Sequence, residues 1–420
     1  MNKVIFVFVL ALSLVYQSFA QSENPNEIFK DDPIGRSAPN TITTAVPFLM
    51  IAPDSRAGGM GDAGAATSPD VNSMHWNPSK YMFCENEMGV AISYTPWLRQ
   101  LVPDMNIGHI VGYYKLDAEN TLAASLTYFS LGSITFTDIV GSTIRDFTPN
   151  EFSIDFAYSR LLGKKFSGAV AVRYIHSNLT GGISNSGAES HPGNSVAADV
   201  AFFYKSDNIK LAGMNSNLMW GLNISNIGNK MSYTSNDLRY FLPTNFRMGI
   251  AYSLELDEYN KLMLTVDMNK LLVPTPPVYR KDTAGWVYDD NGNYVIDYGK
   301  DPNISVPAAL FSSWTDAPGT NSPFAQDGSP SVFREEFAEI QWSIGLEYWY
   351  SNVFALRAGY FNEHQYKGNR KYFSMGAGLK LNVFGLDFAY LIPTSQQHPL
   401  QNTLRFTLTF DIGGLNEEGS

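Results

Sequence analysis

The stretch Glu339-Ile340-Gln341-Trp342-Ser343-Ile344-Gly345-Leu346-Glu347-Tyr348 alternates apolar side chains with polar or small ones without a break. The segment 403–412, near the end of the chain, repeats this pattern with leucine, phenylalanine and isoleucine on one side and mainly threonine, arginine and aspartate on the other. A period of two is typical of a β-strand with one apolar and one polar face. We therefore expect an all-β protein whose strands separate two different environments.

Segments with this pattern recur along the chain from residue 86 onward. We count fourteen: 86–95, 107–116, 121–131, 150–162, 165–179, 194–206, 216–227, 244–257, 260–272, 335–350, 352–363, 371–383, 384–392 and 402–412. A soluble β-sandwich or a secreted propeller would also show alternation. The connections between the segments help to separate these alternatives.

The connections alternate in length. Short turns lie at 117–120, 163–164, 257–259, 351 and the 383/384 junction, with 207–215 somewhat longer; the loops between them are 96–106, 132–149, 180–193, 228–243, 273–334, 364–370 and 393–401. This asymmetry is typical of a transmembrane β-barrel, which must close its sheet because lipid offers no hydrogen bonds. We predict a transmembrane antiparallel barrel over 86–412, with the long loops extracellular. An even strand number also predicts that both chain ends, including a tail at 413–420, are periplasmic.

The two faces of the strands differ in chemistry. The apolar face would contact lipid and includes Ile154, Phe156, Phe202, Trp220, Phe246, Ile250, Phe354, Phe373 and Phe388. The polar face would point into the lumen and carries Asp155, Arg173, Asp199, Arg247, Asp267, Glu347, Arg357, Lys380, Asp387 and Arg405. Because both signs of charge occur there, a network of lumenal ion pairs is expected rather than an open pore of one sign.

The composition agrees with this assignment. Of the 420 residues, 44% are hydrophobic, 14% aromatic and 16% charged, which argues against a disordered chain or a coiled coil. The net charge of −11 argues against a nucleic-acid partner. Cys84 is the only cysteine, so no intrachain disulfide is expected.

The N-terminus predicts export. Lys3 precedes an apolar run, and Ser18-Phe19-Ala20 has the small-x-small form of a cleavage site, so 1–20 is interpreted as a signal peptide. Gln21 follows the expected cut where a lipoprotein would have cysteine. We expect 21–46 to be an N-terminal periplasmic segment.

Residues 47–85 do not alternate and are rich in small side chains. Gly58, Gly59, Gly61 and Gly64 permit close backbone approach, and Asn77-Pro78 suits a turn or the start of a helix. A segment of this kind ahead of a barrel is expected to lie in the lumen as a hatch. Gly58-Gly-Met-Gly61 lacks the spacing of a nucleotide-binding loop.

The hatch sequence carries a specific resemblance. The residues Arg56, Gly58, Gly59, Gly61 and Asp62, then Trp76, Asn77 and Pro78, followed by alternating strands, resemble the FadL-like superfamily of barrels, whose hatch has an Asn-Pro-Ala motif. Ser79 stands here where alanine is usual. Within the superfamily the chain is similar to the PorV family of the type IX secretion system.

This resemblance implies a non-enzymatic outer-membrane protein without cofactors. Its implied partners are the giant translocon barrel, the C-terminal signal domains of secreted cargo, and an attachment complex with a sortase-like peptidase, besides outer-membrane lipid. The alternative is a FadL-type transporter of hydrophobic small molecules, with a pocket near Phe48, Leu49, Met50 and Met60. An enzyme that acts on lipid A is a more distant alternative.

The loop 273–334 is the candidate surface for partner binding. Its aromatic residues include Trp286, Tyr288, Tyr294, Trp314 and Phe324. Exposed aromatic side chains are favoured in protein interfaces, although these could instead form a local core over the barrel mouth. Residues 289–293 lack the spacing of a calcium loop and predict an Asn-Gly hairpin. We assign no catalytic, cofactor-binding or metal-binding residue, because neither histidine spacing nor a GxSxG elbow supports one.

Overall fold

The computed structural model describes residues 40–99, 102, 104–137, 140–182, 190–206, 209–211, 214–234, 239–283, 285–320, 330–395 and 399–413. The expected signal peptide 1–20, most of the segment 21–46 and nearly all of the tail 413–420 lie outside these residues. Within them, no helix has the length and apolar character needed to cross a membrane.

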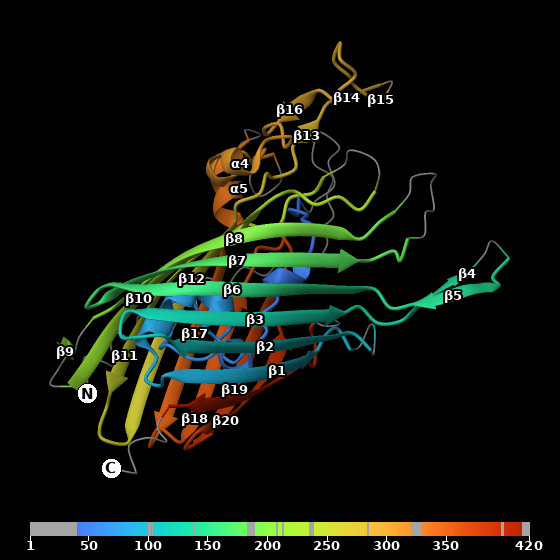
Figure 1. The fold of residues 1–420 in the computed structure, drawn as a ribbon. Coiled ribbons are helices and arrows are strands. Elements are labelled where there is room, and N and C mark those ends of the chain that lie inside the picture. Colours follow the sequence, from blue (N-terminus) through green and yellow to red (C-terminus); the bar gives the residue numbers. More distant parts are fainter. Residues whose placement is uncertain are drawn as a thin grey trace.

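A single antiparallel sheet dominates the molecule (Figure 1). Its principal strands are β1 (Met88–Pro96), β2 (Asn106–Lys115), β3 (Asn120–Ser130), β6 (Asn150–Gly163), β7 (Phe166–Asn178), β8 (Gly193–Lys205), β10 (Met214–Gly228), β11 (Asn245–Glu255), β12 (Asn260–Leu271), β17 (Gln341–Tyr350), β18 (Phe354–Asn362), β19 (Lys371–Leu381), β20 (Phe384–Pro393) and β21 (Leu404–Ile412). Neighbours in the sequence are neighbours in the sheet.

The sheet closes on itself. It contains fifteen strands, and without the short β9 (Ile209–Leu211), which pairs only with β10, fourteen remain. β1 pairs with β21 and β10 pairs with β11, so the ring has no open edge. The predicted fourteen-stranded transmembrane β-barrel is confirmed.

Burial alternates along the strands as the sequence predicts. In β6, Asp155 is 3% exposed, whereas its neighbour Phe156 is 60% exposed on the outer face. The same contrast holds in β11 between Arg247 at 5% and Ile250 at 51%. Charged groups therefore point into the lumen, and the exposed apolar groups form the outer wall.

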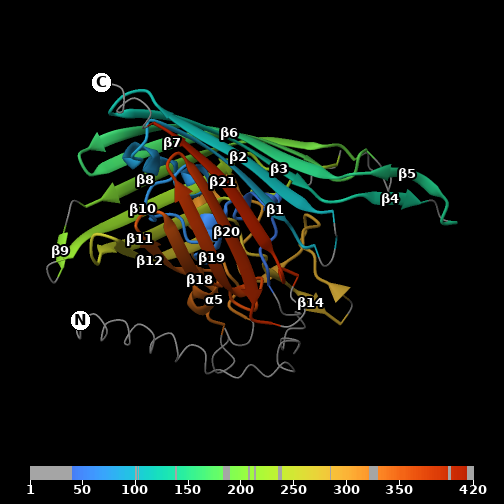
Figure 2. The same cartoon turned by 90° about the horizontal axis from the view of Figure 1, so that it is seen from below.

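Smaller elements lie at the end of the barrel that carries the long loops. The hairpin of β4 (Ile134–Thr137) and β5 (Thr143–Phe147) projects from it (Figures 1 and 2). The connection from β12 to β17, residues 272–340, is called the long loop below. It contains β13 (Val278–Tyr279), β14 (Lys281–Asp282), β15 (Gly285–Trp286), β16 (Ile296–Tyr298), α4 (Val306–Ser312) and α5 (Val332–Ala338).

Helix α5 differs from expectation, because the strand predicted at 335–350 begins only at Gln341. Glu335 is fully buried and Glu336 and Glu339 nearly so, and all three bind lysines. A helical turn brings these three carboxylates to one side, whereas a strand would separate Glu336 from the other two.

The segment 47–85, called the hatch, lies inside the barrel (Figure 1). It contains η1 (Pro47–Met50), α2 (Ser55–Gly58), α3 (Ser73–Trp76) and η2 (Pro78–Phe83). α2 contacts β19, β20 and β21, and η2 contacts β3, β6, β7 and β8 on the opposite wall.

Residues 40–46 lie at the long-loop end. Asn40 Nδ2 donates to Glu335 Oε1 at 3.0 Å, and the Ala45 amide donates to the Phe241 carbonyl at 2.9 Å. The C-terminal strand instead ends beside Met88, at the short-turn end. The prediction that this segment and the C-terminus lie on one side is therefore wrong for residues 40–46, because the hatch crosses the lumen once before β1 begins.

Candidate functional site

Glycines let the hatch approach the wall closely. Gly61 has a φ of +69°, and a Cβ there would lie 2.7 Å from the backbone of Tyr360. A Cβ on Gly64 would lie 2.4 Å from the indole of Trp76. A Cβ on Gly58 would lie 2.5 Å from the side chain of Arg405, and one on Gly59 would lie 3.0 Å from the backbone of Gly376. A side chain at Gly58, Gly59 or Gly61 would therefore move the hatch away from the wall, and one at Gly64 would displace Trp76 within the hatch.

Arg56 is the main ionic contact of the hatch. Its guanidinium donates two hydrogen bonds to Glu347 of β17, at 2.9 and 2.8 Å, and one to Asp70 at 2.8 Å. Glu347 also binds Arg357 at 2.7 Å, which binds Asp387 at 2.6 Å. Residues predicted to face the lumen thus form an ion-pair chain that continues into the hatch.

A second contact joins Asp62 to nearby strands, β19 and β21. Arg405 Nη1 donates to Asp62 Oδ1 at 2.5 Å, and the Tyr372 hydroxyl donates to Oδ2 at 2.5 Å. Asp267 of β12 accepts the amides of Gly64 and Ala65, at 2.7 Å each. The guanidinium of Arg405 is a charged donor, which makes its hydrogen bond stronger than a neutral one.

Trp76, Asn77 and Pro78 organise the second half of the hatch. Trp76 Nε1 donates to Asp54 Oδ2 at 2.6 Å, and Arg247 lies over its indole at 4.6 Å. Asn77 donates to the carbonyls of Ala65 and Phe202 and accepts from the Ser79 amide. Pro78 occupies the first turn of η2, where no amide is needed.

Sequence reasoning did not single out several hatch residues. Asp54 caps α2 by accepting the Ala57 amide at 2.9 Å, and its position directly before that short helix is the signal that could have identified it. Lys80 is 1% exposed and donates to Gly64 O and Thr67 Oγ1, at 3.0 Å each. Nothing in its sequence context indicates burial.

One cavity lies in the lumen beside the hatch. This cavity of about 10 Å³ lies against Phe48, Leu49 and Ile51, and its other walls include His109, Asp155 and Arg173. The apolar pocket expected there also involved Met60, which packs instead in a separate cluster with Phe203 and Met219. This cavity is too small and too polar for a fatty acid.

The long loop is fixed at its base by buried charges. Lys270 Nζ binds Glu336 at 2.9 Å and Glu339 at 2.6 Å, and Lys367 Nζ binds Glu335 at 2.6 Å. Asp316 lies beside them; its burial, with the charges of Glu336 and Glu339, raises its pKa to about 7. The base of the loop is therefore sensitive to ionisation near neutral pH.

The predicted aromatic residues of the loop occupy two places. Trp286, Tyr288 and Tyr294 gather with Tyr279, and the first three are 47%, 53% and 48% exposed. These four residues are called the tip cluster. Trp314 lies at the base, edge-on to Phe246 at 5.5 Å, and Phe324 lies outside the described residues. Tyr288 and Tyr294 form a β-bridge around the Asn-Gly turn at 291–292.

Among the residues that the structure describes, no group of three or more His, Cys, Asp or Glu side chains could hold a metal ion. Cys84 is buried and 3.8 Å from the Asp70 carbonyl. We assign no chemical step to the hatch or to the long loop.

Comparisons with known proteins give both a family and several similar folds. The family model described as type IX secretion system protein PorV matches residues 35–278. A Pseudomonas aeruginosa FadL homologue is 11% identical, with 89% of this chain and 100% of that one covered and a TM-score of 0.37. The Pseudomonas putida toluene transporter TodX is 11% identical, with 84% and 95% covered and a TM-score of 0.43. No curated protein matches significantly.

The family match extends over more than half of the 420 residues and includes the hatch and the strands from β1 to β12. The closed barrel and this match together assign the protein to the outer membrane and to the type IX secretion system. The chain belongs to the PorV family.

Proposed function

We propose that this protein receives cargo proteins at the translocon of the type IX system. It binds their C-terminal signal domains with the long loop and passes them to the surface attachment complex, which contains the sortase-like peptidase. In this proposal the long loops are extracellular. The observation that carries it is the combination of a hatch bound to the barrel wall and a long loop that exposes aromatic side chains among its described residues.

The attachment of the hatch to the barrel wall favours binding over transport. Glu347 is 1% exposed and joins two arginines, and breaking such a buried pair costs about 3–5 kcal/mol. Moving the hatch would break this contact and those of Asp62 and Asp267 together. A hatch held in this way supports a barrel that acts as a scaffold.

The tip cluster supplies the binding surface. Aromatic side chains on a rigid hairpin offer a large contact area with little loss of conformational entropy. Lys281 Nζ lies 4.1 Å from the centre of the Trp286 ring, so a cation accompanies the aromatic groups. The cluster projects beyond the end of the barrel, where a folded domain has access (Figure 1).

A FadL-type transporter remains the alternative proposal. The hatch inside a barrel supports it, whereas the small polar cavity beside Phe48 and Leu49 counts against it. Such a transporter would bind a fatty acid in the purified barrel and would not need the tip cluster.

The test replaces the chromosomal gene with the double variant Trp286→Ala/Tyr294→Ala. Tyr259→Ala serves as the matched control, because Tyr259 is 55% exposed in the short turn at the other end. We expect cargo to accumulate in the periplasm and its C-terminal domain to lose crosslinking to the double variant alone. The proposal would be contradicted if a strain that lacks the gene secreted cargo normally. It would also be contradicted if Tyr259→Ala reduced secretion as much as Trp286→Ala/Tyr294→Ala does.

A further inference from the structure

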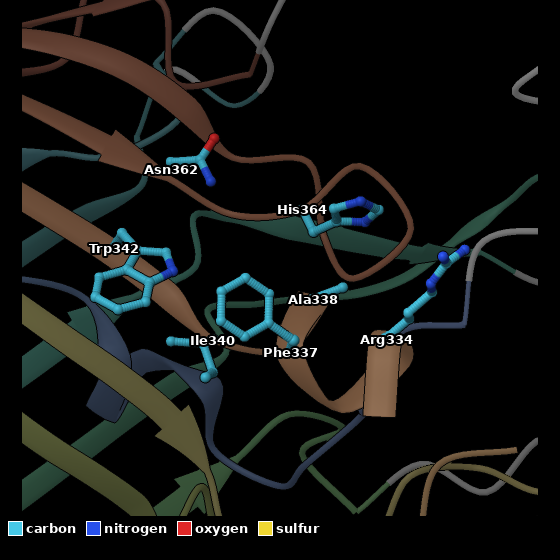
Figure 3. Close-up of a pocket in the computed structure, with 7 residues that line it drawn as sticks. All are labelled: Arg334, Phe337, Ala338, Ile340, Trp342, Asn362 and His364. Atoms are coloured by element: carbon cyan, nitrogen blue, oxygen red, sulfur yellow. The ribbon is translucent and has the colours of Figure 1, made fainter. Parts of the chain in front are cut away.

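We propose that a pocket on the outer rim of the barrel binds one anionic lipid of the adjoining membrane leaflet. The rim pocket has a volume of about 230 Å³ and is formed by Arg334, Phe337, Ala338, Ile340, Trp342, Asn362 and His364 (Figure 3). An acyl chain would lie on Ile340 and Trp342, with its phosphorylated headgroup near Arg334. In the orientation proposed above, this leaflet is the outer one.

Strand register places the pocket on the outside of the barrel. Trp342 and Asn362 are paired across β17 and β18, and their neighbours Gln341 and Phe361 are buried toward the lumen. Side chains on a strand alternate between faces, so Trp342 and Asn362 belong to the face that contacts lipid.

Helix α5 is held against this outer face. Lys270 follows the lumen-facing Asn269, so it points outward at the end of β12. It is nevertheless 1% exposed, because Glu336 and Glu339 cover and bind it. The helix therefore lies over the outer rim, and its free side faces the membrane boundary.

That free side is strongly apolar. Phe333 and Phe337 are 79% and 55% exposed. Beyond the pocket, the outward face of β17 continues from Trp342 to Ile344 and Leu346. Aromatic side chains at this level are typical of the membrane interface, where acyl chains cover the wall. Continuity with the lipid-facing wall thus identifies the occupant as lipid.

The charges around the pocket favour an anionic headgroup. The carboxylates of Glu335, Glu336, Glu339 and Glu363 are all buried, and each binds a lysine or arginine. Arg334 lines the pocket, and its side chain is exposed. Basic pockets at a membrane surface attract phosphorylated headgroups.

The volume suits part of a lipid. It is below the roughly 300–1,000 Å³ of sites that enclose a drug-sized ligand, so one acyl-chain segment fits while the headgroup stays at the rim. The pocket is thus expected to retain a single lipid.

The test is native mass spectrometry of the purified full chain, titrated in detergent with lipid A or with phosphatidylcholine. Wild-type protein is expected to retain one lipid A and to prefer it over phosphatidylcholine. Arg334→Gln should weaken lipid A binding about tenfold, the value of one hydrogen bond between charged groups. Phe337→Ala should weaken binding of both lipids.

Matched variants act as controls. Arg280→Gln makes the same charge change at an exposed arginine on the loop, and Phe311→Ala removes an exposed phenylalanine outside the pocket. Three results would overturn the proposal. The first is equal lipid A binding by Arg334→Gln and Arg280→Gln, and the second is the absence of a preference for lipid A over phosphatidylcholine. The third is a mass increase that corresponds to a second copy of the protein in place of a lipid. The assay contains no cargo, so its failure leaves the proposed secretion function untouched.

Discussion

The hatch and the long loop place charge and aromatic groups in opposite ways. In the hatch, Arg56 and Asp62 are bound to wall residues, and Trp76 is enclosed at 2% exposure. In the long loop the charges are buried only at the base, while Trp286 and Phe311 are exposed at 47% and 80%. The difference shows that the charged groups of the hatch are used inside the barrel, and it is the basis of our proposal that the long loop contacts other molecules.

The largest effect is expected from Glu347→Gln. The substitution leaves Arg56 and Arg357 without their shared carboxylate inside the lumen. We expect the free energy of unfolding to fall by about 3–5 kcal/mol. The measurement is the temperature at which the purified barrel loses its folded gel mobility in detergent.

Glu119→Gln is the control for that loss. Glu119 and Arg160 form an exposed pair at 3.8 Å, for which less than about 1 kcal/mol is expected. If both variants unfold at the wild-type temperature, the hatch is not held by buried charge and the comparison fails.

Gly61→Ala should have the next largest effect. The new Cβ would meet the Tyr360 backbone at 2.7 Å while φ is +69°, so a loss of about 2–3 kcal/mol is expected in the same assay. Gly108→Ala is the control, because no atom lies within 4 Å of a Cβ there. Similar behaviour of the two variants would show that the hatch tolerates separation from the wall.

A smaller effect is expected from pH at the base of the long loop. The pKa of Asp316 is raised to about 7, above the value near 4 of an unfolded chain, so its neutral form is favoured in the folded loop. Stability of the loop base is therefore greatest below about pH 4 and declines as the pH rises through about 7.

Hydrogen exchange of 313–320 measures this decline. After correction for its intrinsic pH dependence, exchange of 313–320 should become faster between pH 5 and 8 in the wild type. In Asp316→Asn it should stay nearly constant. Exchange of the hatch should change less than that of 313–320. An unchanged slope in Asp316→Asn would remove Asp316 as the cause.

The sequence predicted the barrel because strand alternation fixes which way each side chain points. Asp155, Arg173 and Glu347 could thus be assigned to the lumen without knowing their partners. The partners could not be predicted, since Arg56 meets Glu347 across 291 positions and this depends on the path of the hatch. The same path explains why Asn40 lies at the unexpected end. Helix α5 was missed because Glu339 and Ile340 extend the alternation of β17, although Glu336 and Phe337 break it.

The central claim is that the long loop handles cargo while the hatch stays in place. Ser55 Oγ of the hatch lies 3.1 Å from Thr407 Oγ1 of β21, so Ser55→Cys and Thr407→Cys, in a Cys84→Ser background, can join hatch and wall by a disulfide. The measurement is the fraction of cargo that reaches the cell surface in this strain, with and without reductant. We predict wild-type secretion in both conditions, whereas secretion that is blocked until reductant is added would contradict the account.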